Sequence, residues 1–108
     1  MSWNINSLRH RLTALERLVR QIEPDVVCLQ ETKVDDALFP VAAIADLGFE
    51  GIAYRGQKAY HGVAIFAREP FAWVGHERIG RGKRAEEARH LAVTLANGLE
   101  VHNLYVPA

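Results

Sequence analysis

The first thirty residues carry the pattern that most restricts the fold: an amphipathic helix between two short strands. Apolar residues recur at the helical spacing of three and four, at Leu8, Leu12, Leu15, Val19 and Ile22. A strand is predicted before this helix, over residues 2–5, and a buried strand after it, over residues 25–30. Because a strand–helix–strand crossover favours a parallel pair, the chain is predicted to open as an α/β protein.

Both ends of the first helix have a signal in the sequence. Asn6 or Ser7 can cap its start, because a short polar side chain accepts a hydrogen bond from the free amides of the first turn. Pro24 ends it, because proline disfavours helical backbone in the residue before it.

The rest of the chain predicts one more helix and then a run of strands. The second helix is expected from Asp35 or Asp36 to about Leu47, where Gly48 closes it. Strands are expected over residues 49–54, 62–67, 71–75, 92–95 and 99–104. Asn97-Gly98 between the last two predicts a hairpin with a type I′ turn. The polar stretch 76–87 is expected to be a surface loop.

Composition excludes several classes of protein. The 108 residues are 49% hydrophobic with a formal net charge of zero, which argues against disorder and against a generally polybasic nucleic-acid coat. A single cysteine, Cys28, rules out an intrachain disulfide and fits a cytoplasmic location; it is expected to be an inert core residue. No apolar run reaches the roughly 18 residues of a membrane helix, and no secretory signal is visible. The five histidines lack ligand spacing and are expected on the surface or in loops.

Polar side chains follow three of the predicted strands, where α/β sheets usually bind their ligands. These are Asn4 and Asn6, the segment 30–33, and the segment 103–105. Glu31 could bind a hard cation such as Mg²⁺, or it could be a solvated glutamate paired with Lys33. The two asparagines could hold a carboxylate or phosphate, or simply cap the helix. Tyr105 could offer its phenol to a phosphate or pack in the core.

Four segments resemble a known family when they are taken together and in order. They read SWNINSLR at 2–9, PDVVCLQETK at 24–33, GQKAYHGVAIFAR at 56–68 and HNLYVPA at 102–108. The chain resembles the N-terminal half of bacterial exonuclease III, in the endonuclease/exonuclease/phosphatase superfamily. The resemblance implies half of a four-layer, DNase I-like α/β sandwich with mixed sheets. Residues 1–108 would be a partial domain ending after NLYVP, before the Asp-x-Asn motif and the Asp-His pair of the family's second half.

The resemblance also implies a role for each candidate site residue. Tyr105 and Asn4 would be catalytic, while Glu31 and Asn6 would lie at the metal, which would be Mg²⁺ with Mn²⁺ as a second candidate. DNA-backbone contacts would come from four cationic residues: Arg9, Lys33, Lys58 and Arg89.

The implied function is a Mg²⁺-dependent DNA phosphodiester hydrolase of exonuclease III type. It would act on double-stranded DNA with abasic sites or 3′ ends, in base-excision repair, and would be inactive as this chain alone. Two alternatives stay open: a non-catalytic, nucleic-acid-binding half-domain, and a phosphatase or phosphodiesterase acting on a lipid or inositol phosphate.

A half sandwich is also expected to expose an apolar sheet face. The residues expected to supply it are Val26, Val27, Leu29, Val63, Ile65, Val93 and Leu95. Such a face would favour self-association or pairing with a complementary C-terminal half. No membrane partner is expected.

Overall fold

The computed structural model describes residues 1–57, 60–75 and 88–105. Its helices are α1 (Leu12–Ile22), the 3₁₀ turn η1 (Asp36–Leu38) and α2 (Val41–Ala45). Its strands are β1 (Ser2–Asn4), β2 (Val26–Gln30), β3 (Gly51–Gln57), β4 (Tyr60–Ala67), β5 (Trp73–Gly75), β6 (His90–Thr94) and β7 (Glu100–Leu104). Each predicted strand is therefore present, with ends shifted by up to three residues. The predicted loop 76–87 lies outside the described residues.

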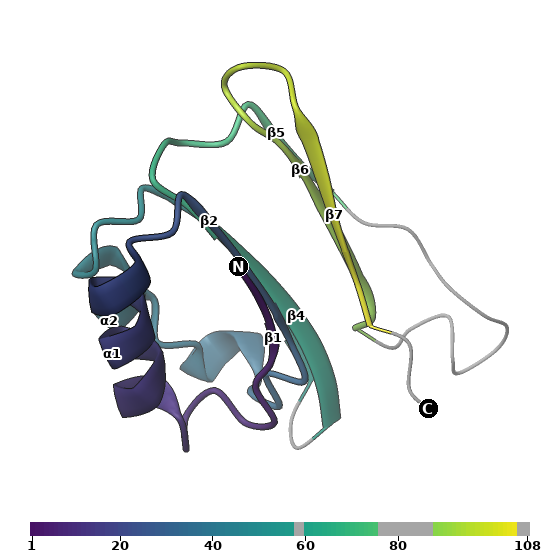
Figure 1. Ribbon diagram of the computed structural model, residues 1–108. Coiled ribbons are helices and arrows are strands. Elements are labelled where there is room, and N and C mark those ends of the chain that lie inside the picture. Colours follow the sequence, from purple (N-terminus) through teal and green to yellow (C-terminus); the bar gives the residue numbers. More distant parts are fainter. Residues whose placement is uncertain (58–59, 76–87, 106–108) are drawn as a thin grey trace, which may run out of the picture.

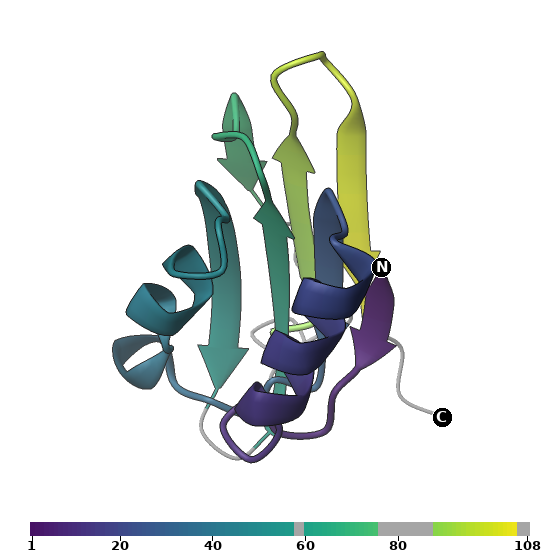
Figure 2. The ribbon, with the colours of Figure 1, turned by 60° about the vertical axis from the view of Figure 1, so that its left-hand side comes forward.

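The strands form two sheets that face each other. One has the order β1-β2-β4-β3 and the other the order β5-β6-β7. β1 and β2 are parallel, as the strand–helix–strand opening predicts, and every other described pair is antiparallel. The helices cover one face of the first sheet, and the second sheet lies against its other face (Figures 1 and 2). The described part of the chain thus has a helix layer and two sheet layers.

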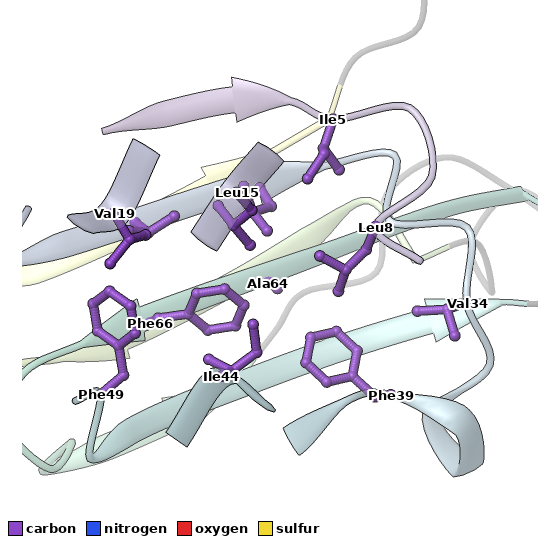
Figure 3. Packing of buried hydrophobic residues seen from close by; sticks show 12 residues of the cluster. Ile5, Leu8, Leu15, Val19, Val34, Phe39, Ile44, Phe49, Ala64 and Phe66 are labelled. Carbon is purple, nitrogen blue, oxygen red and sulfur yellow. The ribbon is translucent and has the colours of Figure 1, made fainter. Parts of the chain in front are cut away.

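The larger core lies between the helices and the first sheet. Leu15 and Val19 of α1 and Ile44 of α2 point onto Phe66 and its neighbours on β4 (Figure 3). All of these side chains are almost completely buried. Burying a side chain of this size stabilises the fold by roughly 1.5–3 kcal/mol relative to leaving it exposed.

A second core lies between the two sheets. Val63 and Ile65 of β4 meet Leu91 and Val93 of β6 there. The prediction that these residues form an exposed apolar face is therefore wrong. Five of the seven residues expected on it are at most 2% exposed and the other two, Val26 and Leu95, are partly buried against this core. The second sheet covers Val63, Ile65 and Val93, whereas Val27 and Leu29 face the core under the helices.

The start of α1 differs from the prediction. The helix begins at Leu12, with Arg11 at its N-cap and no side-chain capping bond. Neither Asn6 nor Ser7 is the cap, because both have a positive φ and belong to the turn that leaves β1. Leu8 is buried in that turn rather than in the helix. The apolar spacing correctly placed Leu15 and Val19 in the core, but it did not locate the first helical residue, and Ile22 at the helix end is 57% exposed.

The predicted second helix is interrupted. The chain forms η1, becomes extended at Phe39 with ψ 131°, and forms α2 only after Pro40. Pro40 explains this break, because a residue before proline avoids helical backbone and proline has no amide hydrogen to donate. Gly48, with φ 96°, closes the segment as predicted. Within the described ranges no helix is long and apolar enough to cross a membrane.

The hairpin between β6 and β7 is confirmed, but its turn type is not I′. Only Gly98 has a positive φ, 89°, whereas a type I′ turn needs two such residues. The Gly98 amide donates to the Leu95 carbonyl at 2.9 Å, and the Leu95 amide donates to the Leu99 carbonyl at 2.8 Å. This is a three-residue loop with glycine at its left-handed position.

Candidate functional site

The ends of β1, β2 and β7 meet at one edge of the sandwich. Parallel pairing puts Asn4 beside Gln30, so Glu31 leaves β2 next to the end of β1. Tyr105 follows β7 in the other sheet, and its backbone amide donates to the Arg89 carbonyl at 2.7 Å. The Tyr105 hydroxyl donates to Glu31 Oε1 at 2.8 Å. Two residues 74 positions apart in the chain are therefore joined across the sheets.

This contact changes the acidity of the phenol. The hydrogen bond to the Glu31 carboxylate raises the pKa of Tyr105 above its ordinary value, and partial burial and the charge of Glu31 act in the same direction. The Arg89 guanidinium opposes them. Tyr105 is therefore protonated at neutral pH, and it acts as a hydrogen-bond donor rather than as a phenolate.

Lys33 and Asn6 form a second contact at this edge. Lys33 Nζ donates to Asn6 Oδ1 at 2.7 Å. The backbones interlock as well, because the Ser7 amide donates to the Glu31 carbonyl at 2.9 Å and the Lys33 amide donates to the His61 carbonyl at 2.9 Å. The alternative pairing of Glu31 with Lys33 is not what the structure shows, since each has another partner.

The backbone at this edge is strained. Left-handed φ values occur at five non-glycine residues there: Asn6, Ser7, Glu31, Lys33 and His61. Such conformations cost of order 1–3 kcal/mol each and cluster at functional sites, where the surrounding structure holds them. Beside them, a cavity of about 480 Å³ is lined by Ser7, Arg9, His10 and Lys33. Its three basic side chains suit an anionic ligand such as a phosphate.

The remaining predicted site residues are less closely involved. Asn4 is exposed, and its side chain makes no hydrogen bond to the described parts of the chain. Arg89 is half-buried and near enough to Tyr105 to influence its phenol. Lys58 lies outside the described residues. The structure thus brings Glu31 and Tyr105 together, and Asn6 and Lys33 together, and leaves Asn4 at the rim.

Three residues at or near this edge were missed or misread from the sequence. His61 lies in β4 with its ring centroid 5.9 Å from that of Tyr105, although it was expected on the surface or in a loop. Asn103 was marked only as part of the segment 103–105, without a role; it is 2% exposed and hydrogen-bonded across the sheets. His90, also expected outside the core, is buried in β6, and its Nε2 atom lies 3.0 Å from Nδ1 of His102. A polar residue at an inward-facing strand position was the available signal for Asn103.

The residues at this edge can be compared with what a divalent cation needs. Within the described ranges, no three His, Cys, Asp or Glu side chains gather as a metal site. Mg²⁺ is usually held in proteins by one or two carboxylates together with water and substrate phosphate, so the Glu31 carboxylate with the Asn6 amide oxygen fits a sparse site of this kind. Because the Lys33 ammonium occupies Asn6 Oδ1, a cation there would have to displace it.

The sequence and the fold of this chain are similar to those of known proteins. The model of the Endonuclease/Exonuclease/phosphatase family matches residues 1–104. Exodeoxyribonuclease III of Haemophilus influenzae is 41% identical over 69 residues, which cover 64% of this chain and 26% of that protein.

Solved structures are also similar to this chain. An AP endonuclease from Archaeoglobus fulgidus matches with a TM-score of 0.86 and 33% identity, covering 98% of this chain and 40% of that one. A 3′ phosphatase from Neisseria, bound to a product DNA hairpin, matches with a TM-score of 0.83 and 36% identity, covering 96% and 39%. The chain thus spans between about a quarter and two fifths of these relatives. The predicted fold class, an α/β sandwich with a mixed sheet, is confirmed.

Proposed function

Because the chain belongs to the endonuclease/exonuclease/phosphatase family, we propose that it contributes to a divalent-metal-dependent enzyme that hydrolyses the phosphodiester bonds of DNA. The observation that carries the proposal is the hydrogen bond from Tyr105 to Glu31 at the edge where β1, β2 and β7 end. It places an acceptor for a hard cation beside a neutral phenol. Hydrolysis of a phosphodiester needs charge neutralisation and oriented donors around the phosphate, and this pair suits both needs.

Each residue then has a role that its chemistry allows. The Tyr105 hydroxyl donates a hydrogen bond to a phosphate oxygen when Glu31 turns to the cation. Asn4, exposed at the rim, orients a neighbouring polar group through its amide. Arg9, Lys33, Lys58 and Arg89 hold backbone phosphates. Arg9 and Lys33 already line one basic cavity.

The proposed cation is Mg²⁺, with Mn²⁺ able to replace it, held by Glu31 and by Asn6 once Lys33 has moved. When bound, it would polarise the scissile phosphate. Because the described residues offer one carboxylate at this point, we expect binding in the millimolar range without substrate.

The proposed substrate is double-stranded DNA with abasic sites or 3′ ends. The names of the relatives support it, since they include an exodeoxyribonuclease III, an AP endonuclease and a 3′ phosphatase bound to a DNA hairpin. Base-excision repair in the cytoplasm would be the setting. The second candidate, a phosphatase of lipid or inositol phosphates, shares the family but has no such support among these relatives.

The proposal is tested by titrating the chain with Mn²⁺, followed by electron paramagnetic resonance, with and without a duplex containing one abasic site. Glu31→Gln keeps the shape of the side chain but removes its charge. We expect it to weaken Mn²⁺ binding at least tenfold, and we expect the duplex to tighten binding to the unmodified chain but not to this variant. Glu50→Gln, at an exposed position remote from the site, should bind like the unmodified chain. Equal Mn²⁺ affinity of the Glu31→Gln and unmodified chains would disprove the assignment.

A further inference from the structure

Most contact between the two sheets is apolar, and apolar contact does not fix how one sheet is placed along the other. The core between them consists of side chains such as Val63, Ile65 and Val93, whose dispersion contacts are individually weak and non-directional. A hydrogen bond differs, because it weakens steeply when its distance or angle changes. The polar contacts between the sheets are therefore the ones that can set their relative position.

Asn103 makes three of these contacts from a buried position. It is 2% exposed on β7, where it points into the first sheet. Its amide nitrogen donates to the Leu29 carbonyl at 2.8 Å and to the Ala64 carbonyl at 2.9 Å. Both of its amide hydrogens are thus used on neighbouring strands, β2 and β4. A buried amide satisfied in this way is costly to displace, because moving it would leave polar groups unpaired.

Gln30 completes the connection from the first sheet. Its Nε2 donates to Asn103 Oδ1 at 2.8 Å and to Ser2 Oγ at 3.1 Å. We call the contact between Gln30 and Asn103 the inter-sheet amide bridge. Through Gln30 the bridge reaches β1 as well, so it joins all three strands whose ends form the candidate site.

The bridge lies directly beside that site. Gln30 is the residue before Glu31, and Asn103 lies two residues before Tyr105 on the same side of β7. The bridge and the Tyr105–Glu31 hydrogen bond are both 2.8 Å long. The bridge joins β2 to β7 near their C-terminal ends, and the Tyr105–Glu31 bond joins the residues that follow directly after these strands.

We propose that Gln30 and Asn103 are positioning residues that hold the Tyr105 hydroxyl against the Glu31 carboxylate. A slip of β7 by one residue along β2 would be a displacement of about 3.4 Å, which breaks both hydrogen bonds. The apolar core could tolerate smaller shifts, but the bridge cannot. The catalytic meaning of this positioning rests on the proposed function, whereas the contact itself exists without metal, DNA or turnover.

The test is a double-mutant cycle that asks whether the Tyr105–Glu31 contact depends on the bridge. Urea denaturation gives the free energy of unfolding of each chain, and the stability lost in Tyr105→Phe reports on the hydrogen bond from the hydroxyl to Glu31. If the bridge holds this contact, Tyr105→Phe must cost less stability once the bridge has been removed.

Gln30→Met is the main variant, because it keeps the length of the side chain and removes only the amide. We expect Tyr105→Phe to cost little further stability in this variant, while circular dichroism shows retained secondary structure. In Gln21→Met, the same change at an exposed position on α1, Tyr105→Phe should cost as much stability as in the unmodified chain. In the Glu31→Ala background, which has no acceptor for the hydroxyl, Gln30→Met should not change the cost of Tyr105→Phe.

Two results would overturn the proposal. One is a Gln30→Met chain that is less stable but in which Tyr105→Phe costs as much as in the unmodified chain, which would make the bridge structural only. The other is an equal effect of Gln30→Met on the cost of Tyr105→Phe with and without the Glu31 carboxylate. If Gln30→Met does not fold, Gln30→Asn takes its place, since it keeps the amide but is one methylene too short to reach Asn103. None of these readouts uses DNA or a metal, so failure here is distinct from failure of the proposed function.

Discussion

At the scale of single residues, the Tyr105 hydroxyl gives a prediction about pH. Because the folded-state pKa of this phenol lies above its ordinary value of about 10, the folded chain binds the proton more tightly than the unfolded chain does. The resulting stabilisation is complete below about pH 10 and is lost as the pH rises through the folded-state pKa. Tyr105→Phe removes it. We expect this variant to be less stable at pH 7 by roughly 1 kcal/mol or less, and to approach the unmodified chain above pH 10.

Urea denaturation at pH 7, 9 and 11 measures this difference. Tyr54→Phe is the control, because its ring stacks on Phe39 with ring centroids 4.0 Å apart, in the core under the helices rather than between the sheets. If Tyr105 were a core residue only, its substitution would have the same small effect at every pH. That result would contradict the role given to the Glu31 contact.

The same pair shows how far a sequence can define a site. The positions of Glu31 and Tyr105 after apolar strands marked both as candidates, and the resemblance to a known family assigned them roles. Spacing could not predict that they touch, since they belong to different sheets. Nor could it predict that Lys33 would pair with Asn6, because that contact depends on the left-handed backbone at both residues. Local patterns identify strand ends, whereas tertiary packing decides which ends meet.

At the scale of elements, predictions held where one local rule dominated and failed where two rules competed. The apolar spacing of α1 was strong enough to identify its buried face. In the second helical segment, the helical pattern and Pro40 competed, and the proline decided the outcome by forcing Phe39 into an extended conformation. The rule that correctly ends the first helix before Pro24 applies equally at Pro40, so this break was predictable from the sequence.

The hairpin between β6 and β7 gives a prediction at the same scale. Gly98 has φ 89°, and a Cβ atom added there would have nothing within 4 Å. The cost of Gly98→Ala therefore comes from backbone conformation alone, and it should be about 1 kcal/mol. Gly98→Asn should cost less, because asparagine tolerates a positive φ. Urea midpoints of the two variants measure this, and an alanine variant as stable as the asparagine variant would contradict the assigned turn.

At the scale of the whole molecule, four of the seven exposed large apolar side chains of the described residues belong to the second sheet and its hairpin. Strand register puts Trp73 and Leu104 on its outer face, away from the first sheet, and they are 53% and 50% exposed. Val74 and Leu99 nearby are also about half exposed. The helices cover the first sheet instead, as Figure 1 shows. The exposed apolar face expected on residues such as Val27 and Val63 is therefore wrong, because the helices cover one face of the first sheet and the second sheet covers the other.

This outer face predicts concentration-dependent association of the isolated chain. Large exposed apolar side chains on a sheet favour contact with another protein surface, and in a pure sample the available partner is a second copy. We expect the sedimentation coefficient to rise with concentration, and the rise to be reduced in Trp73→Ser combined with Leu104→Thr. Ile22→Ser is the matched control, because Ile22 is 57% exposed but lies on α1, on the opposite side of the first sheet. A sedimentation coefficient that stays constant on dilution, with a cooperative thermal transition, would show that the second sheet needs no cover.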